Sequence, residues 1–298
     1  MATVRKWAEF VKFSHTLFAL PFALSAMVVA ARETQGWPGW RVFLLIMAAM
    51  VCARTCAMAF NRIVDRRYDG LNPRTAGRHL PSGAVSLSGA ITLTVLSAAG
   101  LVVASAGLNT VCFWLSPVAL VAVCFYSLTK RFTDFTHVFL GIALALAPVG
   151  AWLAVRGVDV TWLEGLQMVL MAAAVVFWLV GFDLIYALQD YEFDRAHKLG
   201  SLVVRWGPRN ALVAAFLAHM VMLLILAFFG FVCGFRLVYW LGLGLIAMLL
   251  FVEHLIARRR SLDWVNVAFF RMNALVSSLF FVITVAEVLF PFFRARRG

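Results

Sequence analysis

Charged residues are scarce in this chain of 298 residues. Asp, Glu, Lys and Arg together make up 13% of the sequence, whereas about a quarter is typical of soluble domains. Hydrophobic residues make up 63% and gather in runs of roughly 18 to 25, each long enough to cross a bilayer core of about 30 Å. The pattern excludes a disordered chain, a coiled coil and an ordinary soluble enzyme. It predicts a polytopic membrane protein.

Cysteine is also infrequent. The five cysteines lie in apolar stretches and form no C-x-x-C pair, which excludes a disulfide framework and a cysteine-based zinc site. The sequence further lacks a soluble appendage, a linker and a low-complexity segment. We therefore expect a single integral-membrane domain over residues 1–298, and no feature implies an obligate protein partner.

Acidic residues are outnumbered by basic ones. The chain has 14 Asp and Glu against 26 Lys and Arg, a net charge of +12. No soluble module carries a basic stripe, so this excess does not indicate a nucleic-acid partner. In a membrane protein, an excess of Lys and Arg marks the cytoplasmic loops and their contact with the lipid bilayer.

The hydrophobic runs and the breaks between them predict nine transmembrane helices. These lie near residues 13–31, 42–62, 86–106, 109–128, 136–155, 163–188, 210–233, 237–257 and 267–291. Basic residues precede the first run, as in a signal peptide, but its length and the polar Lys12, Ser14 and His15 at its start favour a retained helix.

The basic residues are distributed unequally between the two ends of these helices. Seventeen fall in the N-terminal segment or the even-numbered loops, and seven fall in the odd-numbered loops or the C-terminal tail. The positive-inside rule therefore predicts that the N-terminus and the even loops face the cytoplasm. The basic tail at residues 294–297 goes against this rule.

Five of the eight aspartates lie in two short segments. In the first, Asn61, Asp65 and Asp69 cover an arc of about 80° at the end of the second predicted helix. In the second, at the end of the sixth, Asp183, Asp190 and Asp194 fall within about 40° on a continuous helix. The spacing of four recurs after 125 residues. We therefore predict an all-α bundle of two similar four-helix halves plus one further helix.

Each row of stacked carboxylates requires positive charge nearby. One interpretation is a set of ion-paired helix ends, with Arg66, Arg67 or Arg195 as partners. That interpretation does not explain two rows on separate helices, one of them with an aligned Asn. Mg²⁺ binds in proteins through one or two carboxylates plus substrate phosphates, so we favour a Mg²⁺–diphosphate site.

Basic residues follow each acidic row and end the fourth predicted helix. Arg78, Lys130, Arg131 and Lys198 lie on the same predicted side as the aspartates, where a diphosphate would need cationic partners. Taken singly, each is better explained as a positive-inside anchor. Three histidines, His137, His219 and His254, are isolated in the sequence and are interpreted as helix-packing or interfacial residues.

These residues resemble the UbiA superfamily of integral-membrane aromatic prenyltransferases. The family's motif N-x-x-x-D-x-x-x-D matches residues 61–69, preceded by the Arg54 that often accompanies it. The run at residues 74–83 is similar to R-T-x-x-R-P-L-P-S-G, with His79 in place of the usual Pro. A second motif, D-x-x-Y-A-x-x-D-x-x-x-D, matches residues 183–194. The resemblance covers nearly the whole chain.

The resemblance implies that a polyprenyl diphosphate ionises to an allylic cation, which the ring of an aromatic acceptor attacks, with Mg²⁺ neutralising the leaving diphosphate. The implied metal ligands are Asn61, Asp65, Asp69, Asp190 and Asp194. The implied diphosphate-binding residues are Lys130, Arg78, Lys198, Arg54, Lys12 and His15. Asp183 or another carboxylate of the second motif would orient or deprotonate the acceptor, and the sequence leaves the identity of the base open. Arg131 would pair with an acceptor carboxylate, and Tyr186 would hold an aspartate in place.

The run Lys12-Phe-Ser-His15-Thr-Leu-Phe-Ala-Leu-Pro21 is most similar to the bacterial 4-hydroxybenzoate polyprenyltransferase-like branch. This implies an enzyme of respiratory quinone synthesis in the bacterial inner membrane, with its active site on the cytoplasmic side. Part of that branch prenylates 1,4-dihydroxy-6-naphthoate instead, and the sequence leaves the acceptor open. The Phe-rich helices are candidates to line a groove for the isoprenoid tail.

A hypothesis of another class is an ion-coupled transporter. It predicts acidic residues deep in several spans, whereas here the acids cluster at helix ends.

Overall fold

The computed structural model describes residues 6–7, 9–11, 16–258 and 268–290. Lys12, His15 and the basic tail lie outside the described residues, so the structure does not test the roles predicted for them. The described residues form helices joined by turns and loops, and none of them lies in a strand. Its helices are α2 (Thr16–Ala30), α3 (Trp40–Leu71), α4 (Leu87–Leu108), α5 (Thr110–Thr129), α6 (Thr136–Arg156), α7 (Trp162–Ala187), α8 (Tyr191–Ala196), α9 (Leu202–Val232), α10 (Leu237–Ala257) and α12 (Asn273–Leu289).

Eight helices in the described residues are long and apolar enough to cross a membrane, and Phe18–Ala30 forms a ninth, shorter apolar helix. The predicted all-α membrane bundle is therefore confirmed. Two boundaries differ from the prediction. Helix α3 continues to Leu71, beyond the end predicted from hydropathy. Its last turns are polar, so hydropathy does not detect them. Helix α9 begins at Leu202 and is kinked at Gly207, which has a φ of 79° and precedes Pro208, since proline cannot continue a regular helix.

Polar residues at the helix starts fix where the spans begin. Side-chain oxygens of Ser86, Asn109 and Ser201 each accept a hydrogen bond from a backbone N–H in the first turn of α4, α5 and α9. Thr161 and Glu164 form a complete capping box at the start of α7. These caps satisfy amide groups that would otherwise be unpaired at helix ends.

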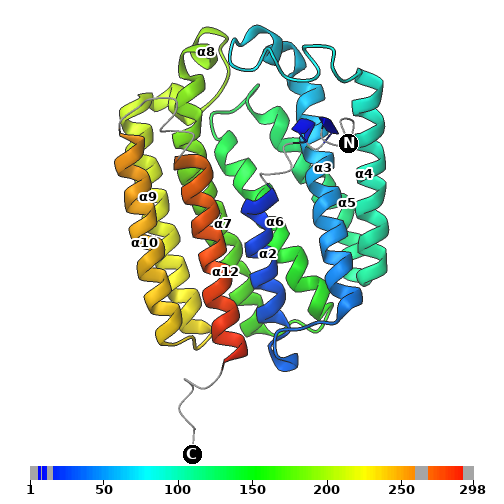
Figure 1. Ribbon diagram of the computed structural model, residues 1–298, viewed down its shortest axis with the longest axis vertical. Helices are drawn as coiled ribbons and strands as arrows, with labels where there is room; N and C mark the ends of the chain where they lie inside the picture. Colours follow the sequence, from blue (N-terminus) through cyan, green and yellow to red (C-terminus); the bar gives the residue numbers. More distant parts are fainter. Residues whose placement is uncertain (1–5, 8, 12–15, 259–267, 291–298) are drawn as a thin grey trace, which may run out of the picture.

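The helices pack most extensively within two groups, α3 to α5 (the first half of the bundle) and α6 to α10 (the second half). The similarity of two four-helix halves stays a prediction. Extensive packing joins α3 with α4 in the first half and α7 with α9 in the second, while α2 packs against α6 and α12 near the middle of the bundle (Figure 1). Phe22 of α2 lies between Trp178 and Phe280, with ring centroids 4.9 Å away on both sides. This aromatic contact joins α2 to the second half.

The segments that follow the two acidic rows lie at the same end of the bundle. The loop 72–86 after α3 and the short helix α8 after α7 both appear at the top of Figure 1. Hydrogen bonds from Asn72 and Arg74 to Asp190, the residue just before α8, link the two segments. The topology thus brings residues more than 100 positions apart in the sequence into one site.

Candidate active site

The first acidic row occupies the last turns of α3. Asn61 donates a hydrogen bond of 2.8 Å to Oδ2 of Asp65, whose Oδ1 accepts a hydrogen bond of 2.9 Å from Arg131. Asp69 is buried and forms an ion pair with Arg78. Every residue of the predicted row therefore faces the same side of α3, as the helical spacing indicated.

The second row is not on one continuous helix, and this part of the prediction was wrong. Helix α7 ends at Ala187, a 3₁₀ turn covers Leu188–Asp190, and α8 begins at Tyr191. Asp190 and Asp194 nevertheless face the first row across the cavity. Asp190 accepts hydrogen bonds from Arg74 and Asn72, and Asp194 accepts one of 3.1 Å from Lys130.

The cations that pair with the aspartates differ from those predicted for ion-paired helix ends. Arg66 donates to the carbonyl oxygen of Ile63 instead of an aspartate. The actual partners are Arg62 within α3, which lies 3.8 Å from Asp69, and four side chains from the loop after α3 and the end of α5, namely Arg74, Arg78, Lys130 and Arg131. Burial works to lower the pKa of the Arg74 guanidinium, but the hydrogen bonds and charges of Asp190 and Tyr186 raise the pKa above its ordinary value.

A cavity of about 260 Å³ lies between these groups. Eleven of the fourteen predicted site residues line it, namely Arg54, Asn61, Asp65, Asp69, Arg78, Lys130, Arg131, Asp183, Tyr186, Asp190 and Asp194. Lys198 does not: its side chain is exposed and its backbone is left-handed, with a φ of 53°. The structure therefore brings together both motifs and most of the predicted cations.

Other cavity residues were not predicted as members of the site. Arg74 and Asn72 were visible in the run after the first motif, and their position there was the available signal. His137 was interpreted as an isolated packing residue, which was wrong, because its Nδ1 lies 2.6 Å from Oδ2 of Asp183. His219 of α9 and His254 of α10 are helix-packing residues as interpreted, since both are buried and their ring nitrogens lie 2.9 Å apart. Tyr186 accepts a hydrogen bond from Arg74.

The donor set matches the chemistry of a hard divalent cation. Four carboxylates and the Asn61 amide supply oxygen ligands around the cavity, and Oδ2 of Asp69 is buried without a hydrogen bond. Among the described residues, no group of three His, Cys, Asp or Glu side chains is close enough to hold a metal alone. The residues thus fit Mg²⁺ completed by substrate phosphates, the usual arrangement for this ion, and do not form a closed protein cage.

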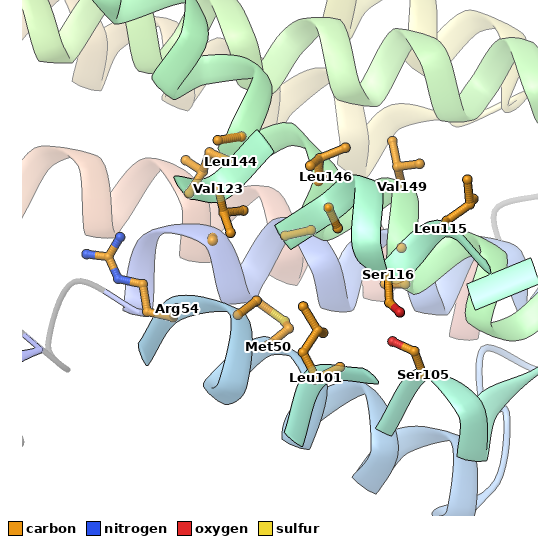
Figure 2. A pocket seen from close by; sticks show the side chains of 18 of the residues that line it. Met50, Arg54, Leu101, Ser105, Leu115, Ser116, Val123, Leu144, Leu146 and Val149 are labelled. Carbon is orange, nitrogen blue, oxygen red and sulfur yellow. The ribbon is translucent and has the colours of Figure 1, made fainter. Parts of the chain in front are cut away.

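An apolar groove of about 380 Å³ adjoins the polar cavity between α3, α4, α5 and α6. The two share Arg54, Tyr126 and Leu140. Figure 2 shows Arg54 at one end of the groove and Ser105 and Ser116 at the other, with their hydroxyls turned toward each other. None of the described residues that line the groove is a phenylalanine, so the Phe-rich helices contribute other side chains to it. Small and branched aliphatic residues leave the space instead.

Gly200 fixes the loop after the second motif against the end of α5. Its N–H donates a hydrogen bond of 2.7 Å to the carbonyl oxygen of Lys130, and a Cβ at this position would lie 2.3 Å from the carbonyl oxygen of Thr133. We expect Gly200→Ala to destabilise the protein by about 1–3 kcal/mol, seen as a lower Tm in detergent. Gly77→Ala, where no atom lies within 4 Å of the added Cβ, is the control, and an equal Tm for the two variants would contradict this account.

The sequence matches the UbiA prenyltransferase family over residues 19–275. It is 32% identical to a 4-hydroxybenzoate octaprenyltransferase from Alcanivorax borkumensis over 230 residues, 76% of each chain. It is 29% identical to another from Vibrio vulnificus, covering 82% of this chain and 84% of that one.

Solved structures agree with this assignment. A UbiA homologue from Aeropyrum pernix K1 superposes with a TM-score of 0.82 at 32% identity, covering 92% of this chain and 98% of the other. A homologue from Archaeoglobus fulgidus bound to GPP and Mg²⁺ shares the fold, with a TM-score of 0.69 at 20% identity and coverage of 94% and 99%. The transporter hypothesis is thereby set aside. The chain belongs to the UbiA prenyltransferase family.

Proposed function

We propose that the chain catalyses Mg²⁺-dependent transfer of a polyprenyl group from polyprenyl diphosphate to the ring of a small aromatic acid. The observation that supports this most is the junction of two spaces with different chemistry. A cavity lined by aspartates and basic residues opens onto an apolar groove, and Arg54, Tyr126 and Leu140 line both. A diphosphate with an isoprenoid tail has the same division between a charged head and an apolar chain.

The proposed metal ligands are the oxygens of Asn61, Asp65, Asp69, Asp190 and Asp194. Mg²⁺ held there supplies positive charge that stabilises the leaving diphosphate. Arg74, Arg78 and Lys130 now pair with these aspartates. When the substrate binds, these three side chains donate hydrogen bonds to phosphate oxygens instead. Lys198 does not line the cavity, and it remains, with Lys12 and His15, a diphosphate contact predicted from the sequence alone.

The groove holds the part of the isoprenoid chain nearest the diphosphate. A cavity of about 150 Å³ accommodates benzene, so on that scale a groove of about 380 Å³ takes on the order of fifteen carbons. The remainder of a longer chain would lie in the bilayer. Because the lining is almost entirely aliphatic, it stabilises a buried isoprenoid chain through the hydrophobic effect, whichever lining residues that isoprenoid contacts.

The proposed reaction is an aromatic substitution. Asp183 takes the proton of the acceptor hydroxyl, the ring carbon beside that hydroxyl bonds to the first carbon of the prenyl group, and the diphosphate leaves with the electrons of the broken C–O bond. The ring hydrogen then moves to the oxygen and restores the phenol, while Asp183 releases its proton to water. The products are the prenylated acid, diphosphate and one proton.

We further propose that the acceptor is of the 4-hydroxybenzoate type, with its carboxylate paired to Arg131, and that the reaction belongs to respiratory quinone synthesis. The names of the relatives from Vibrio and Alcanivorax support this acceptor. The second candidate is 1,4-dihydroxy-6-naphthoate, which also combines a phenol with a carboxylate. The basic loops support a position in the bacterial inner membrane with the active site facing the cytoplasm.

A competition assay tests the proposal. Detergent-purified protein is incubated with Mg²⁺, geranylgeranyl diphosphate and equal amounts of 4-hydroxybenzoate and 1,4-dihydroxy-6-naphthoate, and mass spectrometry identifies the prenylated acid. We expect a prenylated hydroxybenzoate. A prenylated naphthoate as the main product would replace the first acceptor with the second. Intact diphosphate and no prenylated acid would contradict the proposed function.

A further inference from the structure

His137 lies in the first turn of α6 and contacts Asp183 of α7. The distance from its Nδ1 to Oδ2 of Asp183 is 2.6 Å. Both residues line the polar cavity. An ionised carboxylate only accepts hydrogen bonds, so Nδ1 carries the donated proton in this contact.

The two side chains differ in how much they are exposed. The Asp183 side chain is 17% exposed and the His137 side chain is 1% exposed. The other ring nitrogen of His137, Nε2, is buried and has no hydrogen-bond partner. Asp183 therefore presents its atoms to the cavity, and the imidazole lies behind it, held by the contact at Nδ1.

Asp183 also differs from the other aspartates in the chemical type of its partner, which is an imidazole. The others are paired with arginine or lysine side chains, in the pairs Asp65–Arg131, Asp69–Arg78, Asp190–Arg74 and Asp194–Lys130. An arginine or lysine side chain carries several N–H donors that can reach more than one carboxylate oxygen or neighbouring group. The imidazole of His137 supplies one directed hydrogen bond, from Nδ1. It fixes the orientation of Asp183 and leaves its second oxygen available to take a proton.

We propose that His137 is a positioning residue for Asp183, holding Oδ2 so that Oδ1 is directed toward the hydroxyl of the aromatic acceptor. This inference rests on the proposed function. The role resembles that of the residue that orients a general base in other enzymes, where a single hydrogen bond determines which atom meets the substrate.

Three substitutions test this role. His137→Leu removes the donor, and we expect kcat to fall about 10–100-fold, the usual cost of losing such a supporting contact, with both substrate KM values within about threefold of wild type. His137→Asn places an amide N–H near the position of Nδ1, so we expect it to recover most of the lost kcat. His137→Gln places its amide farther along the side chain, at the level of Nε2, so we expect kcat to stay low.

The comparison of Asn with Gln remains informative if the Leu variant fails to fold. Wild-type kcat in the Leu variant would overturn the inference, and so would a folded Asn variant with no more activity than the Gln variant. Binding of farnesyl thiolodiphosphate with Mg²⁺ should be unchanged in all three, and weakened binding would indicate a structural role instead. If the wild-type protein prenylates no aromatic acid, the proposed function is wrong. The inference about His137 is contradicted only when the wild-type protein is active and the variants do not behave as expected.

Discussion

Asp190→Asn is expected to lower kcat/KM for prenyl transfer by at least about 1000-fold while leaving the bundle folded. Loss of a single group that stabilises transition-state charge typically costs 10²–10³-fold, and this change removes both a proposed metal ligand and a negative charge. The change also releases Arg74, whose side chain is 28% exposed. Because water can solvate the released guanidinium, we expect less than about 1 kcal/mol of lost stability.

Asp134→Asn is the matched control for Asp190→Asn. Asp134 pairs with Arg205 at 3.2 Å, is 34% exposed, and does not line the cavity. Its variant should keep activity within about twofold of wild type. Transfer rates would be measured with saturating Mg²⁺, and circular dichroism would confirm that both variants are helical. If Asp190→Asn kept more than one tenth of wild-type kcat/KM, Asp190 would not be a metal ligand.

The second large effect is expected from filling the apolar groove. Ala119 of α5 lines the groove about two turns, or roughly 10 Å, from Tyr126 at the junction with the cavity. In Ala119→Phe, the added ring would take a space comparable to benzene, about 150 Å³, from a groove of about 380 Å³. We expect kcat/KM for geranylgeranyl diphosphate to fall about 100-fold and that for dimethylallyl diphosphate to change less than threefold.

The difference arises because a five-carbon group ends before it reaches Ala119, whereas a longer chain must pass it. Val121→Phe, on the same helix at a side chain that is 67% exposed, controls for the effect of an extra ring on α5 and should leave both substrates unaffected. Parallel assays with the two diphosphates measure the ratio directly. Equal losses for the short and long substrates in Ala119→Phe would show that the chain does not occupy this groove.

The sequence was sufficient for most of the fold because the hydrophobic runs match helix lengths directly. Hydropathy alone ended α3 too early, although the spacing of its polar residues indicated further helical turns, and the spacing argument failed where a turn interrupts the helix, as at Leu188–Asp190. A 3₁₀ turn changes the angle between successive residues. The predicted stripe of Asp183, Asp190 and Asp194 therefore does not lie on one continuous helix.

The site was predictable as two sets of residues but not as a set of contacts. Helical spacing placed Asn61, Asp65 and Asp69 on one side, and the structure agrees. The partners of the aspartates come from distant positions, such as Arg74 and Asp190, which are 116 residues apart. The contact between His137 and Asp183 spans 46 residues and crosses from α6 to α7. Such pairings depend on how the helices pack, which no local pattern specifies.

Equilibrium binding of farnesyl thiolodiphosphate, a substrate analogue that reacts slowly, tests the central claim that the aspartates, Mg²⁺ and diphosphate form one site. Binding to the wild-type protein would be measured by titration calorimetry in Mg²⁺ and in EDTA. We predict that Mg²⁺ strengthens binding at least about tenfold, or about 1.4 kcal/mol, and that Asp190→Asn removes this gain. Equal affinity with and without the metal, or a full Mg²⁺ effect in Asp190→Asn, would contradict the central claim.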